Sequence, residues 1–233
     1  MSSLDYTYEH IDEVISRDVF ECPEIDVSKT ALLVLDLQKL IVDPNGAAHV
    51  ESVGGAPAGK DVVEPCMQVV EHCRKLGMPI IWSLWGLRGD GLDAGMCTLK
   101  WPFMNPGTPD SIATWGQRDA ELDDACDPRD NEPQIYKSRF STFYNTDFDS
   151  YLKDAGADTV VIAGVTTANC MHATAIDGWN RCYKIIGLAD TSTSLPRPGD
   201  NPMGTGQHWE ALRNIQMNYG DVRTSKEFFD MTS

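Results

Sequence analysis

The chain has 233 residues, of which 42% are hydrophobic, and it carries a formal net charge of −16. This length and apolar content suit one domain around a single core. The acidic excess argues against a nucleic-acid partner, because phosphate contacts need clustered lysine and arginine. No apolar run approaches the ~20 residues that span a bilayer, and the first ten residues lack the layout of a signal peptide. We therefore expect a cytoplasmic protein without membrane contact.

The cysteine pattern predicts neither a disulfide framework nor a zinc site. There are seven cysteines, an odd number, and none form a CxxC pair. Most of them are expected to be small buried side chains. A cysteine with a chemical role therefore has to be recognised from its surroundings.

The apolar pattern predicts alternating strands and helices. Residues 1–28 carry many charges and little periodicity, and we interpret them as an N-terminal arm over the surface or a neighbouring subunit. A single domain spanning residues 1–233 is expected, folded as a three-layer α/β/α sandwich with a mainly parallel, Rossmann-like sheet of about six strands. Strands are predicted at residues 29–36, 79–85, 134–137, 159–163, 183–190 and 222–224, and helices at 61–76, 147–155, 169–176 and 208–219.

Residues 86–133 are the least regular part of the chain. Such a long stretch without strong periodicity is unusual inside a compact domain, and insertions of this kind are often lids or binding loops. The acidic run at residues 119–130 shows no fixed ligand spacing, so we interpret it as a solvated face and not as a metal site.

The most informative stretch is the strand, turn and helix start at residues 159–175. Cys170 follows the turn, where Thr167 or Asn169 is expected to cap the helix. The free backbone N–H groups and the positive end of the helix dipole at such a position favour a thiolate. The same N–H groups can hold an oxyanion if the sulfur attacks a carbonyl carbon. Cys170 is therefore the leading candidate for an active centre.

Two other polar side chains end predicted strands. Asp36 and Lys137 stand at the carboxyl ends of their strands, and in a parallel sheet these ends meet at one edge. A thiol nucleophile needs a base, which Asp36 can supply, and a neighbouring Lys137 favours the thiolate. The alternative, that both are merely structural strand-end residues, stays open from periodicity alone.

Several segments resemble the isochorismatase-like cysteine hydrolase family, over roughly residues 29–195. Its members include nicotinamidases, N-carbamoylsarcosine and ureidoacrylate amidohydrolases, and isochorismatases. The likeness rests on the order and separation of three motifs, ALLVLDLQ at 31–38, KSRFSTF at 137–143 and AGVTTANC at 163–170, with further matches at 173–177 and 189–194.

The resemblance implies a catalytic triad of Asp36, Lys137 and Cys170. It also implies an oxyanion hole from the backbone N–H groups of Thr166 and Cys170, and a cis peptide between Val165 and Thr166. On this basis Cys170 attacks an amide or ureide carbonyl and forms a thioester, while Asp36 handles the protons. The resemblance further implies a homo-oligomer, dimer or tetramer.

Departures from the family pattern narrow the expected chemistry. Nicotinamidases bind a metal through an Asp-x-His pair near the second strand, but residues 82–88 here contain no histidine. We therefore predict no metal and no cofactor. Isochorismatases proper tend to lack the nucleophilic cysteine that is present here. The prediction is a metal-independent amidohydrolase of a small amide, carbamoyl or ureido compound; the alternatives are an isochorismatase-type vinyl-ether hydrolase using Asp36, or a catalytically silent binding or scaffold protein.

The pocket walls are predicted from position. Trp82 and Trp85, at the end of the second strand, are expected to line the site together with Gln38 and Phe143. Arg139 or Arg197 is the candidate partner for a substrate carboxylate. The identity of the substrate does not follow from these residues.

Overall fold

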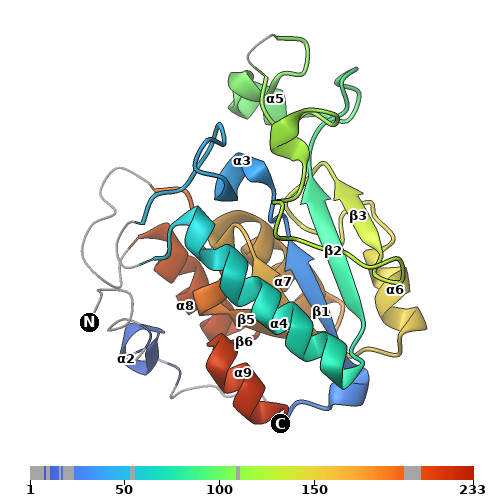
Figure 1. Cartoon of the computed structure of the whole chain (residues 1–233), viewed down its shortest axis with the longest axis vertical. Helices are drawn as coiled ribbons and strands as arrows, with labels where there is room; N and C mark the ends of the chain where they lie inside the picture. The colour runs from blue at the N-terminus through green and yellow to red at the C-terminus, as the bar shows by residue number, and fades with distance from the viewer. Residues whose placement is uncertain are drawn as a thin grey trace.

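The computed structural model describes residues 8, 11–15, 17, 24–52, 56–108, 111–196 and 206–233. Within them a parallel sheet of six strands lies between two layers of helices (Figure 1). The strand order is β3-β2-β1-β4-β5-β6, which confirms the predicted α/β sandwich. The strands are β1 Thr30–Leu35, β2 Ile80–Trp85, β3 Gln134–Lys137, β4 Thr159–Gly164, β5 Lys184–Leu188 and β6 Asp221–Arg223.

The central strands are buried on both faces. Every residue of β1, β2 and β4 is buried, which explains why these segments are continuous apolar runs and not alternating ones. The edge strand β3 alternates instead, with Ile135 and Lys137 turned inward. This alternation brings a lysine into the interior.

Helices cover both faces of the sheet. The helices α4 (Val63–Leu76) and α9 (Ser225–Met231) pack on one face, and α4 ends at Gly77, whose φ of 71° is the left-handed conformation that favours glycine. The opposite face is covered by α2 Ile11–Ile15, α6 Phe148–Asp154, α7 His172–Asn180 and α8 Gln207–Asn218. The shorter helical segments are η1 Val27–Lys29, α3 Lys39–Val42, η2 Gly59–Val62, α5 Cys97–Lys100, η3 Pro102–Met104, η4 Arg118–Ala120, η5 Thr167–Met171 and η6 Ala189–Thr191.

The N-terminal region differs from the expected surface arm where the structure describes it. In α2, Ile11 and Ile15 are buried in the core beside α8. Arg17 is also buried and donates hydrogen bonds to Glu227 and to the Val222 carbonyl. Much of residues 1–23 lies outside the described residues. The described part is thus integrated into the domain because its apolar side chains complete the core.

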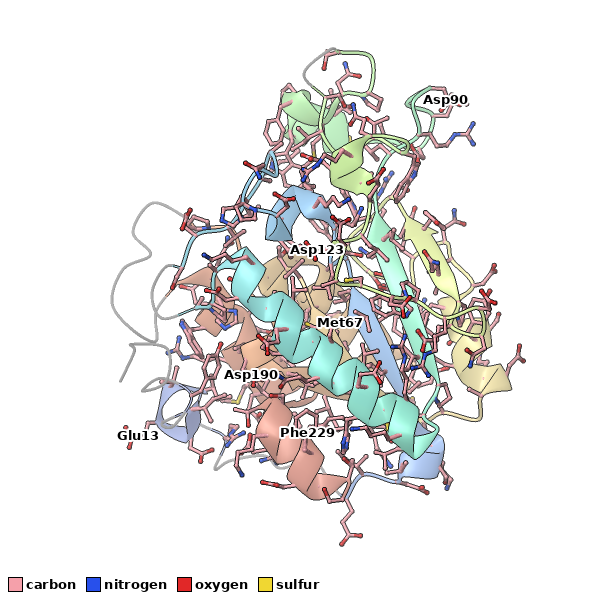
Figure 2. The ribbon with its side chains drawn as sticks, in the orientation of Figure 1. Glu13, Met67, Asp90, Asp123, Asp190 and Phe229 are labelled. Atoms are coloured by element: carbon pink, nitrogen blue, oxygen red, sulfur yellow. The ribbon has the colours of Figure 1, made fainter. Side chains whose placement is uncertain are left out.

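The irregular segment 86–133 extends past the carboxyl ends of the strands, where α5 is seen at the top of Figure 1. A bridge between Gln38 and Leu122 ties it to the domain, and a bridge between Leu87 and Thr114 joins two parts of the segment itself. In Figure 2 the labelled Asp90 of this segment lies in the upper part of the view, far from Glu13 of α2. None of the described helices is both long and apolar enough to cross a membrane.

Candidate active site

The strand order creates a crevice between β1 and β4. The chain proceeds from β1 to β2 on one side and from β4 to β5 on the other, so the connections that leave β1 and β4 diverge. In open α/β sheets ligands bind at such a reversal, outside the carboxyl ends of the strands. Asp36 follows β1 directly, and Val165 and Thr166 follow β4.

Asp36 is held in an uncommon backbone conformation at the end of β1. Its φ is 47°, a left-handed value that aspartate tolerates better than most residues. Its carboxylate is buried and accepts a hydrogen bond from Ser83 Oγ at 2.6 Å. Beside it, a Cβ on Gly164 would stand 2.1 Å from the Leu35 carbonyl oxygen, so only glycine permits β1 and β4 to approach this closely.

Lys137, the last residue of β3, extends its side chain past the end of β2 to the Asp36 carboxylate. Its Nζ lies 2.6 Å from Asp36 Oδ2 and 3.3 Å from Cys170 Sγ, and its side chain is fully buried. Burial alone lowers the pKa of this ammonium, but the charges of Asp36 and Cys170 outweigh it, so the pKa of Lys137 is raised. The lysine is therefore a permanent cation between the carboxylate and the sulfur.

Cys170 lies in η5, a π-helical turn that leads into α7. Burial, followed by the charge of Asp36, raises the pKa of its thiol to about 12, while Lys137 acts in the opposite direction. This corrects the expectation of a thiolate at a helix start, because desolvation outweighs the helix dipole here. The expected caps are wrong as well: Thr166 occupies the N-cap position without a side-chain bond, and the Thr167 hydroxyl lies 2.6 Å from Ser192 Oγ and 2.8 Å from His208 Nδ1.

The turn between β4 and Cys170 contains a cis peptide bond between Val165 and Thr166. Most of its backbone N–H groups already have acceptors: Thr167 donates to Thr193 O, Ala168 to Ser194 Oγ, and Asn169 and Met171 to Thr166 O. The N–H groups of Thr166 and Cys170 are not among these bonds.

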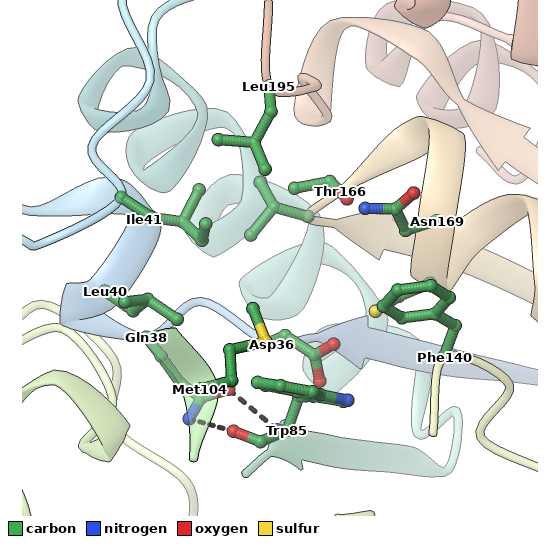
Figure 3. A pocket seen from close by; sticks show the side chains of 13 residues that line it. Asp36, Gln38, Leu40, Ile41, Trp85, Met104, Phe140, Thr166, Asn169 and Leu195 are labelled. Atoms are coloured by element: carbon green, nitrogen blue, oxygen red, sulfur yellow. Dashed lines mark hydrogen bonds between the residues drawn. The ribbon is translucent and has the colours of Figure 1, made fainter. Parts of the chain in front are cut away.

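A small cavity of about 80 Å³ opens above these groups (Figure 3). Asp36 and Cys170 form part of its surface, and most of the remaining wall is apolar. Its lining residues are Asp36, Gln38, Leu40, Ile41, Ala48, Trp85, Met104, Phe140, Val165, Thr166, Asn169, Cys170 and Leu195.

Comparison with known proteins agrees with this geometry. The model of the isochorismatase domain matches residues 30–227. The chain belongs to the isochorismatase family. A ureidoacrylate amidohydrolase, RutB, of Methylorubrum extorquens is 30% identical over 206 residues, which cover 84% of this chain and 80% of that protein. A relative from Arabidopsis thaliana described as a probable inactive nicotinamidase is 29% identical over 170 residues, covering 72% of this chain and 82% of that protein.

Solved structures of the family share the fold. The crystal structure of a cysteine hydrolase from Pseudomonas syringae pv. phaseolicola aligns with a TM-score of 0.79 at 28% identity, over 91% of this chain and 98% of that chain. The N-carbamoylsarcosine amidase of Thermoplasma acidophilum aligns with a TM-score of 0.62 at 23% identity, over 84% and 96% of the two chains, and supports the fold alone.

Two predicted wall residues of this family member lie elsewhere. Trp82 is fully buried in the core on the α4 side, and its Nε1 donates to Glu132 Oε2 at 2.8 Å. Three positions separate Trp82 from Trp85, and side chains alternate along a strand, so the two tryptophans face opposite ways. Phe143 is buried between Phe148 and Tyr183, with ring centroids 4.7 and 5.7 Å away. Neither Trp82 nor Phe143 borders the cavity.

Gln38 and Trp85 do border the cavity, but Gln38 has a different task from the one expected. Its amide nitrogen donates to the carbonyls of Trp85 and Ala120, at 2.9 and 2.8 Å. Its amide oxygen accepts the Trp85 backbone N–H at 2.7 Å. The carboxamide is therefore engaged by the main chain and holds Trp85 in place.

Of the two predicted carboxylate partners, Arg139 does not line the cavity. The Arg139 guanidinium donates to the carbonyls of Asp93 and Ser138 at 2.8 and 2.7 Å. It lines a neighbouring cavity of about 360 Å³ that shares Trp85 and Phe140 with the first. Arg197 lies outside the described residues. Arg139 thus supports the insertion and does not face Cys170.

Other members of the site were missed from sequence. Ser83 is a single polar residue in the apolar strand β2, and that contrast was a usable signal for its bond to Asp36. Phe140 and Asn169 stand inside the recognised motifs, whereas Met104 comes from the irregular insertion and had no signal. Among the residues that the structure describes, no three His, Cys, Asp or Glu side chains are grouped to hold a metal ion.

Proposed function

We propose that this isochorismatase-family protein is a cysteine amidohydrolase that cleaves a C–N bond of a small amide, carbamoyl or ureido compound. The observation that carries the proposal is the position of Lys137 Nζ, 2.6 Å from Asp36 Oδ2 and 3.3 Å from Cys170 Sγ, two residues that line a small cavity. A nucleophile, a base and a fixed cation in contact are the elements that covalent acyl transfer requires. The amidohydrolase names of relatives support the same bond type.

In the first half of the reaction the thiol must lose its proton. The pKa of Cys170 is raised to about 12 by burial and by the Asp36 charge, so the free enzyme holds a thiol beside a carboxylate. Asp36 takes this proton as Cys170 Sγ bonds to the substrate carbonyl carbon. The carbonyl oxygen becomes an oxyanion, to which the backbone N–H groups of Thr166 and Cys170 donate in this proposal.

The intermediate then collapses and its C–N bond breaks. Asp36 delivers the proton to the departing nitrogen, which leaves as ammonia or an amine, and the acyl group stays on Cys170 as a thioester. Lys137 stabilises the negative charge as it moves between sulfur and carboxylate, because its ammonium contacts both.

Water completes the cycle. Asp36 removes a proton from a water molecule, the resulting hydroxide attacks the thioester carbon, and the C–S bond breaks. The proton held by Asp36 returns to the sulfur, which restores the thiol and the carboxylate. Every step uses groups of the chain itself, so the proposal expects activity to survive dialysis against EDTA.

Ammonia release over a panel of small amides, carbamoyl compounds and ureides tests the proposal, with the Cys170→Ala and Cys170→Ser variants beside the unmodified protein. Both variants are expected to lose at least about a thousandfold in kcat, since nucleophile and base act as a unit. Rapid acid quenching followed by intact-mass spectrometry is expected to show the acyl adduct on the unmodified protein only. Cys182→Ala is the matched control, because Cys182 is exposed and far from the sheet edge.

Three results would overturn the proposal. Ammonia release that persists in Cys170→Ala excludes covalent catalysis by this cysteine. Turnover of isochorismate, with none of any amide or ureide, assigns the protein to vinyl-ether hydrolysis by Asp36. Absence of turnover throughout assigns it to a silent binding role.

A further inference from the structure

Trp85 carries an unsatisfied hydrogen-bond donor inside the protein. Its side chain is only 7% exposed, yet its indole Nε1 has no hydrogen-bond partner. Among the described residues, Nδ1 of His49 is the other buried side-chain nitrogen or oxygen in this condition. A buried tryptophan N–H usually finds an acceptor, so its isolation here requires an explanation.

The contrast with Trp82 on the same strand is informative. Its Nε1 lies on the other face of the sheet and donates to Glu132 Oε2 at 2.8 Å. The indole N–H of Trp82, whose ring packs only in the core, therefore has an acceptor within the protein. For Trp85, which borders the cavity with Cys170, the protein provides none.

The position of the indole points to the substrate cavity. Trp85 and Asp36 line the same cavity, and Figure 3 labels both side chains at its wall. The carboxylate oxygens are engaged by Ser83 and Lys137. The Gln38 carboxamide fixes the backbone of Trp85, because it accepts the Trp85 backbone N–H and donates to the Trp85 carbonyl oxygen. The donor is thus held in place at the cavity wall.

We infer that the Trp85 Nε1–H donates a hydrogen bond to a second acceptor of the substrate, apart from the carbonyl that Cys170 attacks. This inference rests on the proposed function, and it narrows the substrate class. Apart from the catalytic groups, the cavity wall is largely apolar, with Leu40, Ile41, Met104 and Leu195 among its members. The substrate class that fits this wall is a small amide or ureide with an apolar body and one further hydrogen-bond acceptor, such as an ether oxygen, a carbonyl oxygen or a ring nitrogen.

Spectra of indole ¹H–¹⁵N groups test the contact directly. The inactive Cys170→Ala protein is labelled with ¹⁵N-tryptophan, and the Trp85 resonance is identified by its loss in a Cys170→Ala/Trp85→Phe protein. Two pairs of probes are titrated: methoxyacetamide against butanamide, and nicotinamide against benzamide. Within each pair the shapes match, and only the first member has the second acceptor.

We expect the acceptor-bearing member of each pair to move the Trp85 resonance downfield. The Trp82 resonance should stay in place because its N–H already bonds to Glu132.

The Trp85→Phe substitution is expected to weaken the affinity for the acceptor-bearing member about tenfold, which corresponds to one hydrogen bond. The affinity for the matched probe without the acceptor should change by less than about twofold. Trp179→Phe is the control, since Trp179 is exposed on α7.

Equal weakening of both members of a pair by Trp85→Phe would overturn the inference and leave the ring as a steric wall. So would a Trp85 resonance that no acceptor-bearing amide moves up to its solubility limit. Because binding is measured in an inactive protein, failure of the inference is distinct from failure of the amidohydrolase proposal, which ammonia release decides.

Discussion

Replacing Lys137 by methionine removes a buried cation and leaves its partner alone. The Lys137 side chain is 0% exposed and that of Asp36 is 6% exposed, so solvent cannot replace the lost ammonium. Methionine matches the length of the lysine stem, which keeps the packing change small. The main consequence is a buried carboxylate that has lost its ion-pair partner and keeps the hydrogen bond from Ser83 Oγ.

The size of the effect follows from this burial. Breaking a buried ion pair by removing one partner costs about 3–5 kcal/mol, because the remaining charge has been taken out of water. For a domain of this size, such a loss lowers Tm by on the order of 10 °C. An exposed pair is a suitable control: Lys29→Met removes the contact with Asp26 at 3.8 Å and is expected to cost less than about 1 kcal/mol.

A double variant separates charge from packing. Asp36→Asn combined with Lys137→Met removes both charges of this ion pair, and asparagine tolerates the positive φ of position 36. We expect the double variant to be more stable than Lys137→Met alone by about 2 kcal/mol or more, although both lack activity. Urea unfolding followed by tryptophan fluorescence measures all four proteins. A Lys137→Met protein within about 1 kcal/mol of the unmodified chain, or a double variant less stable than the single one, would refute the reasoning.

Two further predictions concern protonation. Burial and the charge of Asp36 raise the pKa of Cys170 to about 12. The rate at which iodoacetamide labels this cysteine, measured by intact-mass spectrometry, should therefore rise about tenfold per pH unit between about pH 7 and about pH 10. A rate that reaches a plateau below about pH 8 would contradict this prediction. Burial also lowers the pKa of His208, whose Nδ1 lies 2.8 Å from Thr167 Oγ1, to about 3. Below about pH 6.5 the His208 imidazole therefore binds a proton in the unfolded chain but not in the folded chain. The free energy of unfolding should fall by about 2 kcal/mol as the pH is lowered to about 5. His208→Gln should flatten this slope in urea unfolding; equal slopes in the variant and the unmodified protein would contradict the assignment.

Part of the candidate site could be predicted from local patterns in the sequence. The apolar runs that became β1 and β4 are buried along their whole length, so their composition alone indicated strands inside a parallel sheet. Asp36 and Lys137 stand at strand ends, and parallel strands present these ends at one edge. Cys170 was predicted from the strand, turn and helix start, the recognised motifs grouped it with Asp36 and Lys137, and in the structure Lys137 contacts both of the other side chains.

One error could have been avoided from the sequence. Trp82 and Trp85 differ by an odd number of positions, so a strand places them on opposite faces, and only one of them can border the site. The lone Ser83 shares the parity of Trp85 and indicated which face that would be. Gln38 is a different case, because its three bonds to the main chain of Trp85 and Ala120 depend on two segments that are 47 and 82 residues away.

The amino-acid sequence by itself determined the elements, their order and the residues at the strand ends, because these depend on periodicity and short motifs. Tertiary structure alone decided the protonation of Cys170, since desolvation depends on everything packed around the sulfur. It also decided that Met104 from an irregular insertion closes the cavity, and that Trp85 keeps a free donor there. Both facts arise from contacts between distant segments, which no local pattern encodes.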